Sequence, residues 1–145
     1  MGSTSDANRN GNASIEWRAD FTSVEATVLH AAAFNTRLHA PEEWDWRSIV
    51  ERHSLGWCTA RSSGELVGFA NVVTDGFVHS WLQDVMVLPT HQRSGIGQAL
   101  VALAVDRSRE AGCEWLHVDF DDEMADFYFK ACGFTYTNAG LYYLQ

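Results

Sequence analysis

Lysine is nearly missing from this chain. Lys130 is the only one, and ten Lys and Arg residues stand against nineteen Asp and Glu residues, which gives a formal charge of −9. An acidic surface repels the phosphates of nucleic acids, so we expect no nucleic-acid partner. The same charge favours cationic small molecules or basic peptide ends, but ordinary acidic solubility would also produce it.

Cysteine and long apolar runs are scarce as well. Cys58, Cys113 and Cys132 are odd in number and far apart, which argues against a disulfide framework. The sequence has no C-x-x-C or H-x-x-x-H spacing, so we expect no metal site. No apolar run approaches membrane-spanning length and the start has no signal-peptide core, so we expect no membrane contact and a cytoplasmic location.

What is present indicates one globular domain. The polar start of the chain predicts a disordered tail over residues 1–13, followed by a single domain over residues 14–145. Periodicity predicts helices at 22–34, 41–53, 97–111 and 123–132. It predicts strands at 14–18, 55–61, 65–73, 77–88, 115–120, 134–137 and 141–144. Early hairpins and a later crossover then predict an α/β (α+β) fold with a single mixed sheet of about seven strands and about four helices.

Local signals fix several of these elements. Thr22 and Glu25 have the spacing of a capping box at the start of the first helix. Its predicted buried side consists of Val24, Val28, Leu29 and Ala32. Pro41 is expected to open the second helix. The run Ser-Ser-Gly at 62–64 predicts a hairpin turn.

The strand at 77–88 is apolar on both alternating faces, which is typical of a central strand covered on both sides. Alternation places Trp81, Val85 and Val87 on one face and Leu82, Met86 and Leu88 on the other. Pro89 is expected to end this strand.

A glycine-containing loop joins this strand to the next helix. Gly95 and Gly97 stand where the helix begins, and free amides at a helix start bind phosphate. The loop lacks the third glycine of the dinucleotide fingerprint and the lysine of the nucleotide-triphosphate loop. We therefore expect a pyrophosphate cradle of another kind, with a plain glycine turn as the alternative.

Two motifs resemble those of the GNAT-type N-acetyltransferase superfamily. The run QRSGIG at 92–97 fits that family's acetyl-CoA signature, Q/R-x-x-G-x-G/A. About thirty residues later, DFYFKACGF at 126–134 resembles its second signature, a Phe-Tyr-x-x-x-Gly-Phe run. The resemblance is good from about residue 55 to the end. It implies an enzyme that uses acetyl-CoA as co-substrate to acetylate an amine, on a sheet that splays beside the central strand.

The resemblance also implies residue roles. The backbone of Val85, Met86 and Val87 would pair with the pantetheine arm of acetyl-CoA. The pyrophosphate would be held by the amides of Gln92, Arg93, Ser94, Gly95, Ile96, Gly97 and Gln98. Tyr128 matches the tyrosine that protonates the departing thiolate, although a tyrosine on an apolar helix face can also be plain core.

The general base is less clear from the sequence. Many relatives have a glutamate where this chain has Gln83, which cannot act as a base. Asp84, next to it on an apolar strand, should have a raised pKa, which suits a base, but it can equally be a structural acceptor for loop amides. His79 and His117 are the other candidates because histidine titrates near neutral pH.

Other features bear on the substrates. Asp121 occupies the position of an asparagine that contacts the pantetheine in many relatives, and we expect the acids around it to cap the last helix rather than line an acidic mouth. Six aromatic residues either line an acceptor pocket or form core: Phe34, Trp44, Trp46, Tyr136, Tyr142 and Tyr143. A cationic amine acceptor and a homodimer paired through edge strands are expected. A non-catalytic acyl-CoA sensor and a nucleotide-dependent transferase remain the alternatives.

Overall fold

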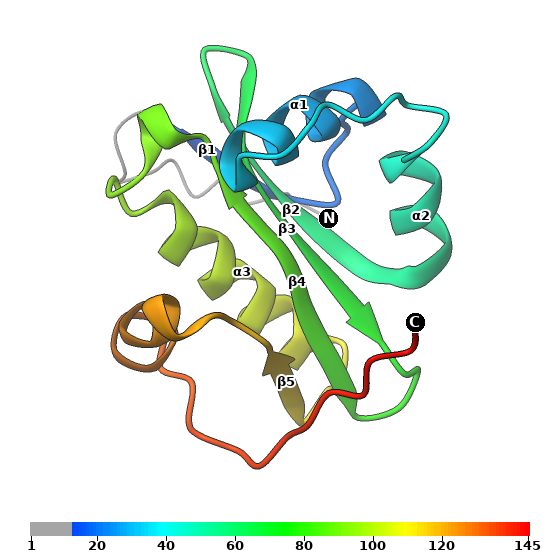
Figure 1. Cartoon of the computed structure of the whole chain (residues 1–145). Helices are drawn as coiled ribbons and strands as arrows, with labels where there is room; N and C mark the ends of the chain where they lie inside the picture. Colours follow the sequence, from blue (N-terminus) through cyan, green and yellow to red (C-terminus); the bar gives the residue numbers. More distant parts are fainter. Residues whose placement is uncertain (1–12) are drawn as a thin grey trace.

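A computed structural model describes residues 13–145 of the chain. The predicted tail lies outside that range except for Ala13, which is buried in the core. Across the described residues the strands are β1 (Ser14–Trp17), β2 (Ser54–Ser62), β3 (Glu65–Thr74), β4 (His79–Val87) and β5 (Trp115–Val118). They form one sheet in that order (Figure 1), antiparallel from β1 to β4 and parallel between β4 and β5. The predicted mixed sheet is therefore confirmed.

Helices cover both faces of the sheet and enclose two cores. The helices are α1 (Ser23–Phe34), α2 (Trp46–His53) and α3 (Ile96–Glu110), with short turns η1 (Pro89–His91), η2 (Asp122–Met124) and the π-helical η3 (Phe127–Ala131). In Figure 1, α1 and α2 lie on one side of the sheet and α3 on the other. The core under α1 and α2 includes Leu29, Val50 and Phe69, and the core under α3 includes Val72, Ile96 and Leu100.

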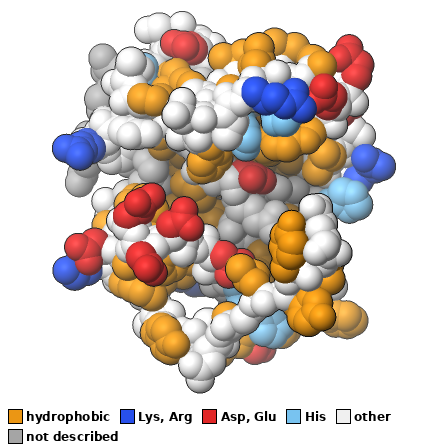
Figure 2. Space-filling view, in the orientation of Figure 1, with side chains coloured by type: hydrophobic (Ala, Val, Ile, Leu, Met, Phe, Trp, Pro, Cys, Tyr) orange, Lys and Arg blue, Asp and Glu red, His pale blue; other side chains and the backbone are white. Residues whose placement is uncertain are grey.

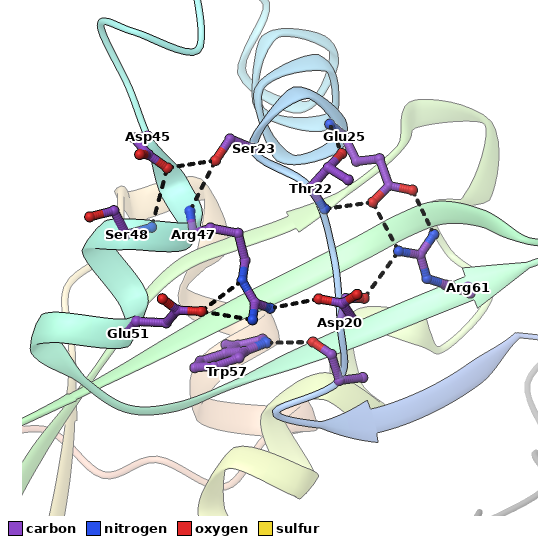
Figure 3. A network of polar contacts seen from close by, with 11 residues as sticks. Asp20, Thr22, Ser23, Glu25, Asp45, Arg47, Ser48, Glu51, Trp57 and Arg61 are labelled. Carbon is purple, nitrogen blue, oxygen red and sulfur yellow. Dashed lines mark hydrogen bonds and ion pairs between the residues drawn. The ribbon is translucent and has the colours of Figure 1, made fainter.

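The first turns of α1 and α2 are tied to each other and to β2 (Figure 3). The amide of Glu25 donates to Thr22 Oγ1 at 3.1 Å and the amide of Thr22 donates to Glu25 Oε2 at 2.8 Å, which confirms the capping box. Asp45 Oδ1 accepts from Ser23 Oγ at 2.9 Å and from the amide of Ser48 at 3.2 Å. These bonds fix the helix layer over the sheet.

Two helix predictions are wrong in detail. Leu29 is buried as predicted, but Val24 and Val28 are 55% and 49% exposed and Ala32 is exposed too, and the side of α1 that packs on the sheet presents Ala26 beside Leu29. The second helix begins at Trp46 rather than Pro41, because the Asp45 carboxylate supplies the cap for its first turn. A helix starts where its free amides find an acceptor, and Pro41 provides none.

The two final strands do not form, so the described residues contain five strands rather than about seven. Residues 132–145 are without regular structure; in Figure 1 they descend from η3 and then run back across the start of β4. Phe134 packs against the core under α3, but five large apolar side chains after it are 79–93% exposed: Tyr136, Leu141, Tyr142, Tyr143 and Leu144. Apolar alternation predicts a strand only where a neighbouring strand completes its hydrogen bonds, and no such neighbour lies beside this segment within residues 13–145.

Candidate active site

A bulge interrupts β4 at Asp84, whose φ of 53° lies in the left-handed region. Asn71 of β3 stands opposite Gln83, but Phe69 stands opposite Met86, so β4 has one residue more than β3 across this interval. Residues beyond the bulge therefore change face: Val85 and Val87 pack with Leu82 in the core under α3, and Met86 joins the core under α1 and α2. The predicted alternation of Val85 with Trp81 is wrong for this reason.

The sheet parts beside the bulge. β5 pairs with β4 only from His79 to Leu82, while β4 continues to Val87. Figure 1 shows β5 ending partway along β4 and the chain then turning toward η2. The outer edge of β4 at Val85–Val87 therefore has no strand partner among residues 13–145, and its backbone can pair with an extended ligand.

The loop after β4 leads directly to the start of α3. Gly95 is the N-cap with φ 86°, and no side chain caps this helix. The first amides of α3, from Ile96 to Gln98, have no acceptor within the helix and point toward the loop. This arrangement suits an anion, because unpaired amides and the positive end of the helix dipole meet there.

Side chains of the loop hold it in place, and the amide of Gln92 donates to the carbonyl of Pro89 at 3.5 Å. Gln92 Nε2 donates to the carbonyl of Val87 at 3.1 Å, and Gln98 Nε2 donates to the carbonyl of Ala131 at 2.9 Å. Ser94 Oγ donates to the carbonyl of His91. The predicted cradle residues are thus brought together at the end of β4, where a side chain at position 97 would meet Phe127 Cζ at 3.3 Å.

Tyr128 lies in η3 on the α3 side of the sheet and is 6% exposed. Its ring stacks on Phe120 at 4.8 Å between centroids and meets Phe134 edge-on at 5.7 Å. Burial raises the pKa of Tyr128 to about 12, so the hydroxyl keeps its proton at neutral pH. Tyr128 belongs to the core cluster under α3, and Val85 and Val87 of β4 pack against the same cluster.

Asp84 is on the α1 side of the same position. Burial raises the pKa of the Asp84 carboxyl, while the charge of His30 and a hydrogen bond from the Asn71 side chain act in the opposite direction. Asn71 is itself buried and accepts from Ser54 Oγ. Figure 2 shows a recess in the middle of this face with an acidic side chain in it and histidine side chains above. A partly desolvated carboxylate attracts a cation more strongly than one in water does.

His30 is the residue that the sequence analysis missed. Its ring lies within 4.8–5.6 Å, between centroids, of Phe34, Trp44 and Trp46. These three predicted pocket residues do come together, whereas Tyr136, Tyr142 and Tyr143 lie in the exposed final segment. The signal available was helical spacing, because His30 follows Ala26 by four residues on the side of α1 that faces the sheet.

His79 and His117 lie elsewhere in the sheet. The Nδ1 atom of His79 is 2.8 Å from the Nε2 atom of His117, and the His117 ring stacks on Trp81 at 4.9 Å. Six residues of strand separate His79 from Val85, about 20 Å at 3.3 Å per residue. The structure therefore brings these two histidines to each other rather than to Asp84.

Asp121 begins η2 without capping it. The carbonyl of Asp121 accepts from the amide of Met124 at 2.8 Å, but its side chain makes no capping hydrogen bond. The expected cap is wrong here because the predicted helix at 123–132 is divided into a short turn and a π-helix. The Asp121 carboxylate is exposed and stays available for other contacts.

Among residues 13–145, no group of three or more His, Cys, Asp or Glu side chains is arranged to hold a metal ion. None of the helices within residues 13–145 has the length and apolar character needed to cross a membrane.

Comparison with known proteins shows which family the sequence matches. The model of the Acetyltransferase (GNAT) family matches residues 16–134. An aminoglycoside N(6')-acetyltransferase type 1 from Stenotrophomonas maltophilia is 31% identical over 107 residues, which cover 67% of this chain and 70% of that protein.

Solved structures agree in fold. A GNAT family acetyltransferase from Streptococcus pneumoniae TIGR4 superposes with a TM-score of 0.73 at 22% identity, over 92% of this chain and 98% of that one. The structure of AAC(6')-Iy in complex with a CoA-containing bisubstrate analog has a TM-score of 0.73 at 18% identity, over 93% and 99% of the two chains. At these identities the likeness concerns the fold alone.

Proposed function

The chain belongs to the Acetyltransferase (GNAT) family, and from this premise we propose that it transfers an acetyl group from acetyl-CoA to a primary amine. The observation that carries the proposal is the free edge of β4 at Val85–Val87, which leads through a braced loop to the uncapped start of α3. An extended arm can pair with the strand while its diphosphate meets the helix amides.

The fit to acetyl-CoA comes mainly from backbone groups. Val85, Met86 and Val87 would hold the pantetheine as an added strand. The amides of the loop would hold the diphosphate: Gln92, Arg93, Ser94, Gly95, Ile96, Gly97 and Gln98. Asp121, exposed beyond β5, is proposed as a side-chain contact to the pantetheine.

The reaction needs a base and an acid on either side of the thioester. An ammonium has no lone pair, so it must lose a proton before it attacks the carbonyl. Asp84, on the α1 side of β4, is the proposed base. Tyr128, on the α3 side, is the proposed acid that protonates the leaving thiolate. A backbone amide of β4 would stabilise the oxyanion.

The acceptor is proposed to be a cationic amine. The formal charge of the chain is −9, and the partly desolvated Asp84 carboxylate interacts electrostatically with His30, whose ring contacts Phe34, Trp44 and Trp46. Aromatic rings with a carboxylate attract an ammonium by cation–π and ionic contacts. The acceptor would enter from the α1 side, opposite Tyr128.

The location and assembly are also proposed. The three cysteines are free thiols, which is consistent with the proposed location in a reducing cytoplasm. We propose that two copies of the chain pair through the open edge of β5 and the exposed apolar segment at 134–144. A strand edge beside unpaired apolar residues is the kind of surface that a second copy covers.

The experiment that tests the activity follows free thiol while the protein is incubated with acetyl-CoA and a panel of amines. Release of thiol that depends on a particular amine supports the transferase. Tight CoA binding without thiol release from any amine in a broad panel would instead support a non-catalytic acyl-CoA sensor. Thermal-shift measurements with ATP, NAD and CoA distinguish both from a nucleotide-dependent transferase, which ATP or NAD would stabilise.

A further inference from the structure

His30 stands between the bulge of β4 and a group of aromatic rings. Helix α1 packs on β3 and β4, and its His30 interacts electrostatically with Asp84 at the bulge. Phe34, Trp44 and Trp46 surround the imidazole from three directions. This packing fixes the orientation of the ring.

One nitrogen of that ring has unused bonding capacity. The Nδ1 atom of His30 is buried and has no hydrogen-bond partner within residues 13–145. A buried polar atom without a partner is costly, so such atoms in folded proteins usually meet water or a ligand.

The charged groups around His30 come from two directions. The charge of Asp84 of β4 acts on the imidazole, and the ring of His39, in the α1–α2 connection, lies 6.3 Å away between ring centroids. Beyond His39, Glu43 accepts from His39 Nδ1 at 3.2 Å and pairs with Arg37 at 2.9 Å. Helix α2 contributes only the uncharged ring of Trp46. These groups connect the bulge to the protein surface.

We propose that His30 is a catalytic residue of this transferase, whose Nδ1 accepts the proton that the acceptor nitrogen loses when it bonds to the acetyl carbon. The inference rests on the proposed acetyl transfer and adds a second base to Asp84. Burial lowers the pKa of His30, which keeps the imidazole neutral and its lone pair available at neutral pH.

The proton count requires two acceptors. The substrate ammonium gives its first proton to Asp84, and the resulting amine attacks the thioester carbon. The new C–N bond makes the nitrogen cationic, and its second proton passes to His30. The C–S bond breaks with its electron pair on sulfur, which takes a proton from Tyr128. Of the two protons held by Asp84 and His30, one returns to Tyr128 and one leaves to water.

A route for the departing proton is present on the same side. His39 stacks on Trp44 at 3.8 Å and bonds to Glu43, whose side chain is 48% exposed. One water molecule between the rings of His30 and His39 would span their separation. The path thus runs from a buried carboxylate through two imidazoles to an exposed carboxylate.

The test compares His30→Phe, which keeps an aromatic ring, with His30→Gln and with the control His53→Gln on the exposed end of α2. Each full-length variant is assayed for thiol release from acetyl-CoA across pH, for CoA affinity and for melting temperature. We expect both His30 variants to lose about 100-fold in kcat. Their CoA affinity should be unchanged, and the loss of activity that the wild type shows on acidification through the His30 pKa should disappear. The control should behave as wild type.

Each outcome has a defined meaning. Added imidazole should restore part of the activity of His30→Gly. Variants that keep wild-type kcat and the same pH profile would overturn the role of His30 while leaving the transferase intact. Equal losses of kcat, CoA affinity and melting temperature in both variants would show a packing role and overturn it too. A wild-type protein that releases no thiol with any amine would overturn the proposed function itself.

Discussion

Arg61 of β2 binds both carboxylate oxygens of Glu25 in α1, Nη1 to Oε1 and Nη2 to Oε2, each at 2.9 Å. Glu25 also receives the amide of Thr22, so one side chain closes the helix cap and anchors the helix to the sheet (Figure 3). The Arg61 contact lowers the pKa of Glu25 to about 2 from its ordinary 4.5. The position of α1 over the proposed acceptor site depends on this contact.

Arg61→Gln should therefore reduce the free energy of unfolding at neutral pH by about 1 kcal/mol, a value discounted for the partial exposure of both partners. Because the folded-state pKa of Glu25 is lowered, this stability is present above about pH 4.5 and is lost as the pH falls toward 2. Urea denaturation at several pH values measures it. The exposed pair of Arg109 and Asp106 gives the control Arg109→Gln. A difference that grows on acidification would contradict the prediction.

Gly97→Glu should abolish binding of CoA. A Cβ at Gly97 would lie 3.3 Å from Phe127 Cζ and 3.8 Å from Val87 Cγ2, and the carboxylate would add negative charge where the diphosphate is proposed to sit. Gly140→Glu adds the same charge where a Cβ meets nothing within 4 Å, so its affinity should stay at the wild-type value. Calorimetric titration with CoA compares them. If Gly97→Glu bound CoA with wild-type affinity, the loop and the start of α3 could not be the diphosphate-binding site.

Tyr128→Phe should lower kcat by about 100-fold and leave CoA affinity nearly unchanged, because only the proton donor is removed. Since the pKa of Tyr128 is about 12, the wild type should show no alkaline loss of activity from this group below that value. Tyr136→Phe, in the exposed segment, is the matched control. Parallel losses in turnover and CoA affinity would indicate that Tyr128 serves packing instead.

Asp84→Asn should lower kcat/KM by about 100-fold, whereas His117→Gln should change it by less than about threefold. The reason is position: Asp84 lies at the parted edge of β4, and His117 stands opposite Trp81 and bonds His79. Steady-state assays with one amine decide between them. A large loss in His117→Gln with wild-type behaviour in Asp84→Asn would reverse the assignment of the base.

Replacing Leu141 and Leu144 together with Asp should convert a dimer into a monomer. Both side chains are exposed by about nine-tenths, and charges there would oppose burial against a second copy. Light scattering coupled to gel filtration gives the mass of wild type and variant. Phe77→Asp changes an exposed apolar residue in the β3–β4 turn and serves as control. A wild type that is monomeric at every concentration would reject the dimer.

The sequence by itself determined the features that depend only on residues close together in the chain. Thr22 and Glu25 close the capping box, Ser63 and Gly64 take the positive φ values of a tight hairpin turn, and Gly95 begins α3 in the left-handed region. Each depends on hydrogen bonds or backbone freedom among near neighbours, which the order of residues fixes.

Tertiary structure decided what depends on distant partners. The bulge at Asp84 exists because β3 and β4 pair with unequal numbers of residues, and it reverses the faces of Val85 and Val87. The electrostatic interaction of His30 with Asp84 depends on how α1 packs on β4. The segment at 134–144 has a strand-like pattern but no strand, because strands form only where another backbone supplies their hydrogen bonds.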